Sequence, residues 1–218
     1  MILAIYGTGG GGKETMHMAE EIQKYESKWE KIVFIDDTKK TGKFKGYECY
    51  PYDVFKKKYS NEEVKIHTAI GELQSKRKVI EKIKLDGYKL ENIIHPHANI
   101  AESALLGDGV QIKMGACVGE NCIIGEGTWI QAYAVIKDNV TVGNWCQISA
   151  KCSIEKSAMI DDSVFIGMHA VVLPGIKVKN FSIISMGAVV CSDVQTECVC
   201  MGNPGRIMST NKNHKVFQ

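Results

Sequence analysis

The sequence predicts a chain of two fold classes: an α/β domain over residues 1–90 and an all-β parallel β-helix over 91–208, followed by a polar tail over 209–218. Two observations support this division. Apolar runs and amphipathic segments alternate in the first part, which is typical of a small parallel sheet covered by helices. The second part repeats an aliphatic residue at every sixth position, which is typical of a parallel β-helix.

The α/β part begins with the apolar run ILAIY, which has the length and composition of a buried strand. A glycine-rich stretch follows, and strand-like and helix-like segments then alternate. The expected strands are 2–6, 31–37 and 64–70, and the expected helices are 13–26, 52–59 and 72–85.

The repeat of the second part runs from Ile94 to Val190 without a slip. A period of six does not give one stripe on a helix, because residues about 100° apart place every sixth position about 240° further round. It suits short strands joined by tight corners, with the aliphatic side chain inside the coil. If each coil has three sides of one repeat each, a coil contains about 18 residues. The seventeen repeats then make about five to six coils. The repeat positions are Ile94, Ile100, Leu106, Ile112, Val118, Ile124, Ile130, Ile136, Val142, Ile148, Ile154, Ile160, Ile166, Val172, Val178, Ile184 and Val190.

A residue from a small set, Ala, Val, Cys, Thr, Ile or Ser, follows each aliphatic residue by four positions, as at Ala98 and Ala116. We expect it to let the chain turn close to the axis of the coil. Cys122, Cys146 and Cys152 fall on this position. The chain has 8 cysteines but no C-x-x-C pair. Buried, reduced thiols in a cytoplasmic protein are therefore expected, rather than disulfides or metal ligands.

Composition excludes several classes of protein. The 27 basic and 25 acidic residues leave a net charge of +2, so no broad cationic surface for nucleic acid is expected. No run of 18 apolar residues occurs, so no membrane span is expected. The start of the chain lacks the charged and long apolar regions of a secretory signal, which also favours a cytoplasmic location.

The stretch GTGGGGK, residues 7–13, follows the first expected strand, and FIDD, residues 34–37, ends the second. Glycines let the backbone approach an anion, and N–H groups at the start of the next helix bind it. Ligands of open α/β sheets bind at the ends of the strands, where the two carboxylates lie. The alternative is that the glycines serve only the turn. The spacing does not match G-x-G-x-x-G, so a dinucleotide site is not favoured. The candidate ligand-binding residues are Gly9, Gly10, Gly11, Lys13, Asp36 and Asp37.

These stretches, with IIHPHANI (93–100), VVLPGIKV (171–178) and MGNPGRIM (201–208), make the chain resemble the NeuD/PglD-like nucleotide-sugar acyltransferases of bacteria. The resemblance implies a Rossmann-like N-terminal domain and a left-handed β-helix that assembles as a homotrimer. It also implies transfer of an acetyl group from acetyl-coenzyme A to the amine of a nucleotide-linked amino sugar. The coenzyme would lie between neighbouring prisms, and the nucleotide against the first domain.

The chain departs from this family where a catalytic histidine is expected, because Asp138 holds that position in AVIKDNVTVG. Two further family histidines correspond to Gly11 and Gln147. An amine must be neutral to attack a thioester, and an aspartate with a pKa near 3.9 is a poor base unless burial raises it. Asp138 could be a base of raised pKa or an anchor for the ammonium group. The amine could instead lose its proton to solvent, or the protein could have changed substrate or lost acyl transfer. Asp138 could also be an ordinary turn carboxylate.

His169 is deep in the repeat, at a corner, and is the second catalytic candidate, with a solvent-facing histidine as the alternative. His95 and His97 lie where the two halves meet and are expected to be structural. The remaining histidines, His17, His67 and His214, belong to no motif. The histidine pair five residues apart that is expected of a zinc-dependent β-helix hydrolase does not occur, so no metal is expected.

Coenzyme A contacts in such proteins are largely to the backbone along the groove. By matching position the candidates are Lys156, Met168 and Met186, and Arg206 could meet the phosphates. Two alternatives to sugar N-acylation remain. The protein could bind a nucleotide sugar without turning it over, or it could acylate a hydroxyl group.

Overall fold

The computed structural model describes residues 1–216. The chain divides into two compact units: the first consists of Met1–Gly71 and Ser75–Ile93, and the second of Glu72–Gln74 and the residues from Ile94 onward. The division after Ile93 lies three residues beyond the end of the expected α/β domain at 90. None of the helices in the described part of the chain is long and apolar enough to cross a membrane.

The first unit is built on one six-stranded sheet with strand order β3-β4-β2-β1-β5-β6. All neighbouring strands are parallel except β3, which pairs antiparallel with β4. No sequence pattern predicted β3, β4 and β6, because strands this short show no clear periodicity. The strands are β1 (Ile2–Tyr6), β2 (Lys31–Ile35), β3 (Gly42–Phe44), β4 (Tyr47–Tyr50), β5 (Val64–Thr68) and β6 (Lys89–Leu90).

Three helices accompany this sheet: α1 (Gly10–Tyr25), α2 (Tyr52–Lys58) and α3 (Leu73–Leu85). Helix α1 begins three residues before the predicted position 13, so the last glycines of the motif form its first turn. The reason is local packing, because Gly12 is buried and lies against the backbone of the preceding loop. Apolar residues of β1, β2 and α1, including Leu3, Phe34 and Ile22, form a common core.

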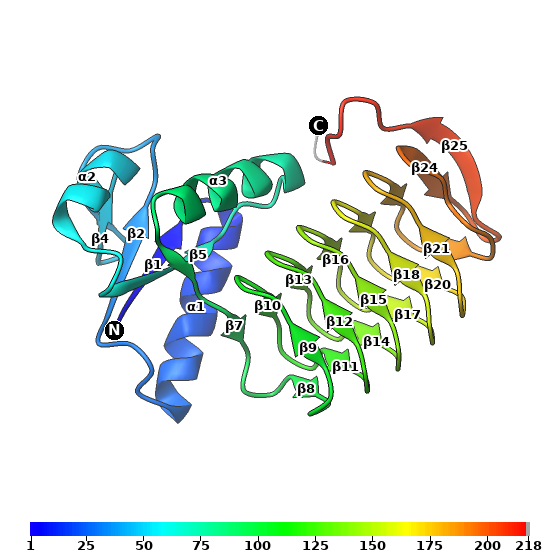
Figure 1. Cartoon of the computed structure of the whole chain (residues 1–218), viewed down its shortest axis with the longest axis horizontal. Coiled ribbons are helices and arrows are strands. Elements are labelled where there is room, and N and C mark those ends of the chain that lie inside the picture. Colours follow the sequence, from blue (N-terminus) through cyan, green and yellow to red (C-terminus); the bar gives the residue numbers. More distant parts are fainter. Residues whose placement is uncertain (217–218) are drawn as a thin grey trace. The chain divides into compact units, whose positions relative to one another are not determined.

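The second unit is a parallel β-helix whose two-residue strands stack as successive coils, drawn from green to orange in Figure 1. Each strand pairs with the strand one coil further on, as Ile112 pairs with Ile130 and Ile130 with Ile148, a step of 18 residues. The aliphatic residue of each repeat is the second residue of its strand, and from Ile112 onward it is buried. The predicted period, register and core are therefore confirmed.

The strands of the coils form three sheets. One face contains β7 (Ile93–Ile94), β10 (Gln111–Ile112), β13 (Trp129–Ile130), β16 (Gln147–Ile148), β19 (Phe165–Ile166) and β22 (Ile183–Ile184); the second contains β8 (Asn99–Ile100), β11 (Cys117–Val118), β14 (Val135–Ile136), β17 (Ser153–Ile154), β20 (Val171–Val172) and β23 (Val189–Val190); the third contains β9 (Leu105–Leu106), β12 (Ile123–Ile124), β15 (Thr141–Val142), β18 (Met159–Ile160) and β21 (Lys177–Val178).

The corners between faces depend on a residue that the sequence analysis did not single out. From Gly109 to Gly187, every sixth residue has positive φ and lies three positions after the inward aliphatic residue. Most of these residues are not glycine; His169, for example, has φ 57°. The small residue that follows, such as Ala170, is fully buried inside the prism. The residue in the left-handed backbone conformation therefore makes the turn, and the small residue leaves room for the aliphatic side chains.

The three cysteines at small-residue positions are buried, as expected. Their thiols donate to backbone carbonyl groups: Cys122 to Lys137, and Cys152 to Gly167 at 2.9 Å. Burial raises the pKa of Cys152 to about 11, so this thiol is unreactive. All 8 cysteines are free thiols.

The expected polar tail begins inside a strand. Residues 209 and 210 belong to β25 (Arg206–Thr210), which pairs antiparallel with β24 (Cys198–Met201). The next segment packs on the last coil: the Asn211 side chain donates to the carbonyl of Phe181 at 2.9 Å, and the His214 ring stacks on Phe181. Single contacts of this kind leave no periodic pattern in the sequence, so the sequence did not predict them. Residues 217 and 218 of the predicted tail lie outside the described residues.

We predict that Ile148→Val lowers the free energy of unfolding by about 1 kcal/mol, because it removes one buried methylene from the core of the β-helix. The matched control is Ile123→Val, which removes the same group from a side chain that is 48% exposed on the outer surface. Urea denaturation of both variants tests this. Equal losses in the two variants would contradict the assignment of inward and outward positions.

Candidate functional site

One pocket of the first unit, here called the glycine pocket, lies beyond the carboxyl ends of β1, β2 and β5. Its volume is about 390 Å³. It brings together Gly9, Gly10 and Gly11 with Asp36 and Asp37, as the sequence predicts for a ligand site. The predicted Lys13 is exposed but does not line the pocket. The lining residues are Tyr6, Gly7, Thr8, Gly9, Gly10, Gly11, Asp36, Asp37, Thr38, Ala69, Ile70 and Gly71.

The sequence analysis missed part of this lining. Ala69 and Ile70 belonged to the strand predicted over 64–70, but β5 ends at Thr68 and the following residues turn into the pocket wall. Thr8 and Thr38 are short polar residues next to the predicted motifs, and only their position after β1 and β2 could have identified them.

The N-terminus of α1 opens into the glycine pocket. Its N-cap, Gly9, provides no side-chain hydrogen bond, and its first turn has no acidic residue. The first intrahelical backbone bond runs from the N–H of Lys13 to the carbonyl of Gly9 at 3.1 Å. The N–H groups before it have no intrahelical acceptor, and together with the helix dipole they favour an anion.

Four glycines of the motif fall into two groups. A side chain on Gly12 would place its Cβ 2.1 Å from the carbonyl oxygen of Gly7, and Gly7 itself has φ +114°. The fold therefore requires both. A Cβ on Gly9 or Gly10 would meet no atom within 4 Å, and neither residue has positive φ. The turn alone does not explain these two glycines, but close approach of a ligand to the backbone does.

Asp36 connects two loops that line the glycine pocket. Its Oδ2 accepts hydrogen bonds from the backbone N–H of Thr8 at 3.0 Å and from the Thr8 hydroxyl. Its Oδ1 accepts from the N–H and hydroxyl of Thr38 at 2.9 and 2.6 Å. Partial burial raises the pKa of Asp36, but the hydrogen bonds from Thr38 and Thr8 outweigh it and hold the pKa below its usual value.

Asp37 lies beside Asp36 and is more exposed. Its Oδ2 accepts a hydrogen bond from the Tyr6 hydroxyl at 2.5 Å, and its Oδ1 accepts from the N–H of Tyr52 at 2.8 Å. The ammonium group of Lys82 lies 3.7 Å from Oδ2. Burial raises the pKa of Asp37, but Tyr6, Tyr52 and Lys82 together lower it, so the carboxylate is charged at neutral pH.

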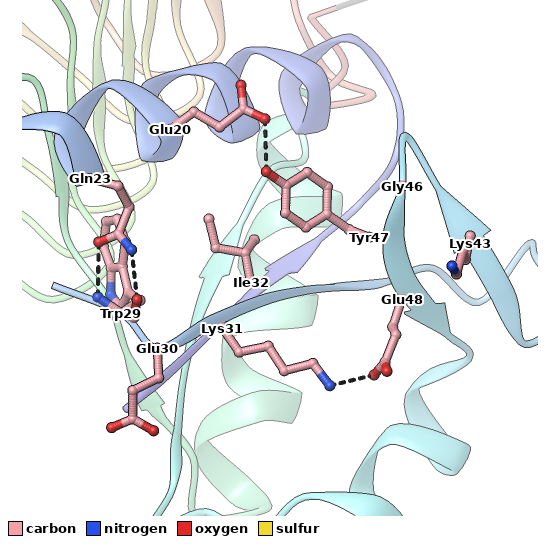
Figure 2. Close-up of a pocket in the computed structure, with 10 residues that line it drawn as sticks. All are labelled: Glu20, Gln23, Trp29, Glu30, Lys31, Ile32, Lys43, Gly46, Tyr47 and Glu48. Atoms are coloured by element: carbon pink, nitrogen blue, oxygen red, sulfur yellow. Dashed lines mark hydrogen bonds and ion pairs between the residues drawn. The ribbon is translucent and has the colours of Figure 1, made fainter. Parts of the chain in front are cut away.

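A second and larger pocket of the same unit, about 550 Å³, lies between α1, β2 and the β3–β4 hairpin (Figure 2). Its polar side chains bind one another. The Tyr47 hydroxyl donates to Glu20 at 2.8 Å, and Lys31 pairs with Glu48 at 2.8 Å. The Gln23 side-chain amide donates to the carbonyl of Trp29 and accepts from the N–H of Trp29. Several of its polar side chains thus have partners in the protein, and it contains none of the ligand-site residues that the sequence predicts.

The ion pair of Glu48 in this second pocket can be tested through the pH dependence of the free energy of unfolding. The hydrogen bond from Lys31, followed by those from Tyr50 and Tyr59, lowers the pKa of Glu48 from 4.5 to about 2. A lowered pKa in the folded state stabilises the fold above pH 4.5, and this contribution is lost as the pH falls from 4.5 toward 2. Since Glu48 is 36% exposed, solvent screening leaves only about 0.5–1 kcal/mol.

We therefore predict that Glu48→Gln lowers the free energy of unfolding at pH 7 by that amount, and that parent and variant converge near pH 2–3. Denaturation series across pH measure this, with Glu62→Gln, at an exposed turn position, as the control. A difference that is constant with pH would show that the lost stability does not come from the charge of Glu48.

The predicted catalytic residues lie at two different corners of the β-helix. Asp138 and Lys156 follow β14 and β17, one coil apart, and form an ion pair at 3.3 Å. Met168 and His169 follow β19, and Met186 follows β22, so these three lie at the corner after another face. Within one chain the structure thus brings Asp138 together with Lys156, but not with His169.

The environment of Asp138 bears on one interpretation of its role, that of a base with a raised pKa. The hydrogen bond from Lys156, and then the N–H of Glu120 donating at 3.2 Å, lower the pKa of Asp138. A base that works near neutral pH needs the opposite shift. This geometry does not support a base of raised pKa, and it favours a permanently charged carboxylate.

The other candidates of the β-helix are exposed. His169, Met168 and Met186 are exposed, and Arg206 begins the exposed strand β25. Gln147, at a family histidine position, lies in β16.

Two of the other histidines, His95 and His67, are buried. The Nδ1 atom of His95 accepts a hydrogen bond from the N–H of His97 at 3.0 Å, as expected of a structural pair. His67 is fully buried, and burial lowers its pKa to about 4. Within residues 1–216, no three His, Cys, Asp or Glu side chains gather to hold a metal ion.

Comparison with known families gives one match in each unit. Residues 2–83 match the PglD N-terminal domain, and residues 121–156 match the bacterial transferase hexapeptide repeat. Among named relatives, a 2,3,4,5-tetrahydropyridine-2,6-dicarboxylate N-acetyltransferase of Clostridium perfringens is 38% identical over 52 residues. That match covers 24% of this chain, and the chain spans only 22% of the length of that relative.

Solved structures match nearly the whole chain. The acetyltransferase domain of PglB from Neisseria gonorrhoeae FA1090, in complex with acetyl coenzyme A, is 25% identical with a TM-score of 0.88, over 95% of this chain and 98% of that one. PerB from Caulobacter crescentus, in complex with CoA and GDP-perosamine, is 23% identical with a TM-score of 0.87, over 96% and 98%. This confirms the fold class, a Rossmann-like α/β domain followed by a left-handed parallel β-helix. A match to the PglD N-terminal domain followed by a match to the hexapeptide repeat is the arrangement that the resemblance to the NeuD/PglD-like proteins predicts.

Proposed function

We propose that the protein is an acetyltransferase that moves the acetyl group of acetyl-coenzyme A to the amine of a nucleotide-linked amino sugar, in the synthesis of a glycan. The observation that carries the proposal is the likeness over both domains to an acetyltransferase domain solved with acetyl coenzyme A. A structure of the same fold holds CoA and GDP-perosamine, which are a coenzyme and a nucleotide-linked sugar.

The glycine pocket supplies the nucleotide half of this site. The backbone N–H groups at the start of α1, left open by Gly9 and Gly10, suit a diphosphate. The carboxylates that follow β2 lie where the nucleoside of such a ligand binds in open α/β sheets. Lys13 is exposed and lies one turn into α1, so it acts on the phosphates only through its long-range charge.

The β-helix supplies the acetyl half. Lys156, Met168, Met186 and Arg206 are the candidate contacts of the coenzyme. They lie at separate corners and on β25, so a single site that uses all of them requires neighbouring chains, as in a homotrimer. We place His169 in the same groove. Such an enzyme draws on acetyl-coenzyme A in the cytoplasm, which is our proposed location.

Asp138 has a different role from the base that the family uses. Its ion pair with Lys156 keeps it charged, so it holds the amino group and stabilises the positive charge that builds on nitrogen during attack on the thioester. The proton then leaves to solvent. The replacement of a histidine by Asp138 also supports a second candidate function, nucleotide-sugar binding without transfer.

Thermal shift of the full chain distinguishes these functions. Acetyl-coenzyme A and UDP-, dTDP- and GDP-linked amino sugars are added singly and in pairs, because ligands of the native state raise the midpoint by mass action. The acetyltransferase predicts shifts with both ligands and release of free coenzyme A when they are combined. A shift with the nucleotide sugar alone supports binding without transfer. Release of coenzyme A only with an acceptor that lacks an amine would indicate acylation of a hydroxyl.

A further inference from the structure

The third face of the β-helix carries a row of apolar side chains on its outer surface, on β9, β12, β15 and β18 (Figure 1). Leu105, Ile123 and Met159 are 65%, 48% and 42% exposed. Leu105 pairs with Ile123, Ile123 with Thr141 and Thr141 with Met159, each one coil further along. These four residues are here called the outer stripe. Single exposed apolar side chains are ordinary, but a row in register is typical of an interaction surface.

The proposed acetyl-transfer site does not use the outer stripe. Asp138 and Lys156 follow strands of the second face, whereas Met168 and Met186 follow strands of the first face. These candidates therefore lie at the two corners that border the second face. A homotrimer that joins those corners needs no side chain from the strands of the third face.

The corners beside Leu105 and Ile123 are acidic. Glu102 and Glu120 lie at the corner before the third face, and Asp108 lies at the corner after it; all three are exposed. A cationic partner is therefore favoured there, and an anionic one is repelled. The four corner segments on either side of these two strands contain no lysine or arginine: they are 101–103, 107–109, 119–121 and 125–127.

The backbone of the third face is already paired between coils. The N–H of Leu105 donates to the carbonyl of Cys122 at 2.8 Å, and the N–H of Ile123 donates to that of Val140 at 3.0 Å. A partner therefore binds this face through side chains, as an amphipathic helix does, and not by adding a strand. Neighbouring strands are about 4.8 Å apart, and side chains three or four residues apart on a helix rise by about 4.5–6 Å, so the two spacings match. About ten residues of helix span the three steps from Leu105 to Met159.

We infer that the outer stripe is a docking surface for a basic amphipathic helix of another protein. The apolar side of that helix covers Leu105, Ile123 and Met159, and lysine or arginine side chains beside it meet the carboxylates of the two acidic corners. Such a contact holds a second protein beside this one without using a residue of the candidate site.

Two synthetic peptides of about 14 residues, long enough for the about ten that the stripe spans, test the inference. One has leucines at helical spacing with lysines beside them, and the other has the same composition in a shuffled order that forms no apolar side. Each carries a fluorescent label, and its anisotropy is recorded as the full chain is added. We expect the amphipathic peptide to bind at least about tenfold more tightly than the shuffled one, and added salt to weaken it.

Two variants of the chain, each with a matched control, locate the binding surface. Ile123→Glu puts a charge in the middle of the outer stripe and should weaken binding at least about tenfold. Val54→Glu, at a 40% exposed position of α2, should not weaken it. Glu120→Lys should weaken binding about threefold at low salt, whereas Glu62→Lys, which changes the net charge equally at an exposed turn of the first unit, should not. Thermal denaturation verifies that all four variants are folded.

The outcomes are distinct. Equal affinities for the two peptides, or an Ile123→Glu chain with the parent affinity, would overturn the inference. Sedimentation velocity of the parent and of Ile123→Glu covers another occupant. A parent that forms a larger oligomer than the variant would show that a second copy of the chain covers the outer stripe, which also overturns the inference. Acetyl transfer should be unchanged in Ile123→Glu, so failure of this inference leaves the proposed function intact.

Discussion

Gly12→Ala is expected to lower the free energy of unfolding by about 3 kcal/mol, whereas Gly10→Ala, two residues earlier, leaves stability unchanged or slightly higher. The added Cβ at Gly12 would lie 2.1 Å from the carbonyl oxygen of Gly7. Relief requires movement of α1 or of the loop after β1, and both are backbone. At Gly10 the same methyl group meets no atom within 4 Å.

Gly10→Ala, which leaves stability unchanged, is expected to affect ligand binding. Gly10 lines the glycine pocket, so its new methyl group occupies space next to the N–H groups of the helix. We expect Gly10→Ala to weaken nucleotide binding about tenfold despite its normal stability. Urea denaturation and calorimetric titration of both variants test the two effects. A Gly10→Ala chain with parent affinity would show that no ligand approaches the backbone there, and a stable Gly12→Ala chain would refute the close contact with Gly7.

Asp138→Asn is expected to lower kcat/KM for acetyl transfer about 10- to 100-fold, the worth of a hydrogen bond to a charged group. The expected reason is the loss of a negative charge beside the nitrogen that becomes positive during attack. The midpoint of the acid limb of the pH–rate profile should not move. Lys156 and the N–H of Glu120 hold the pKa of Asp138 below its usual value, so its titration lies below the pH range of the assay.

Rates of acetyl transfer between about pH 5.5 and 9 measure this effect. Glu120→Gln is the control, because Glu120 holds the matching corner position one coil earlier and is exposed. If the acid limb disappears in Asp138→Asn, Asp138 is a general base after all. If rate and profile both match the parent, Asp138 is neither base nor anchor, and the amine is positioned by other groups.

The sequence by itself determined the β-helix almost completely. An aliphatic residue at every sixth position from Ile94 to Val190 requires only that each short strand bury one side chain, so the pattern is local and repeats without long-range information. It gave the register of 18 residues and the core. The order of β1, α1 and β2, and the meeting of the glycine motif with Asp36 and Asp37, also followed, because the ends of parallel strands share one edge.

The tertiary structure alone decided how those residues are used. Asp36 and Asp37 are adjacent and chemically identical, yet Thr8 and Thr38 saturate the first while the second remains open. Gly10 and Gly12 look alike in the motif, but only Gly12 meets the backbone of Gly7. The 18-residue repeat places Asp138 and Lys156 at one corner, but only the structure shows that their side chains form an ion pair at 3.3 Å. Hydrogen bonds and close contacts of this kind depend on positions to within a fraction of an ångström, set by packing between distant segments, and a pattern of residue types does not encode them.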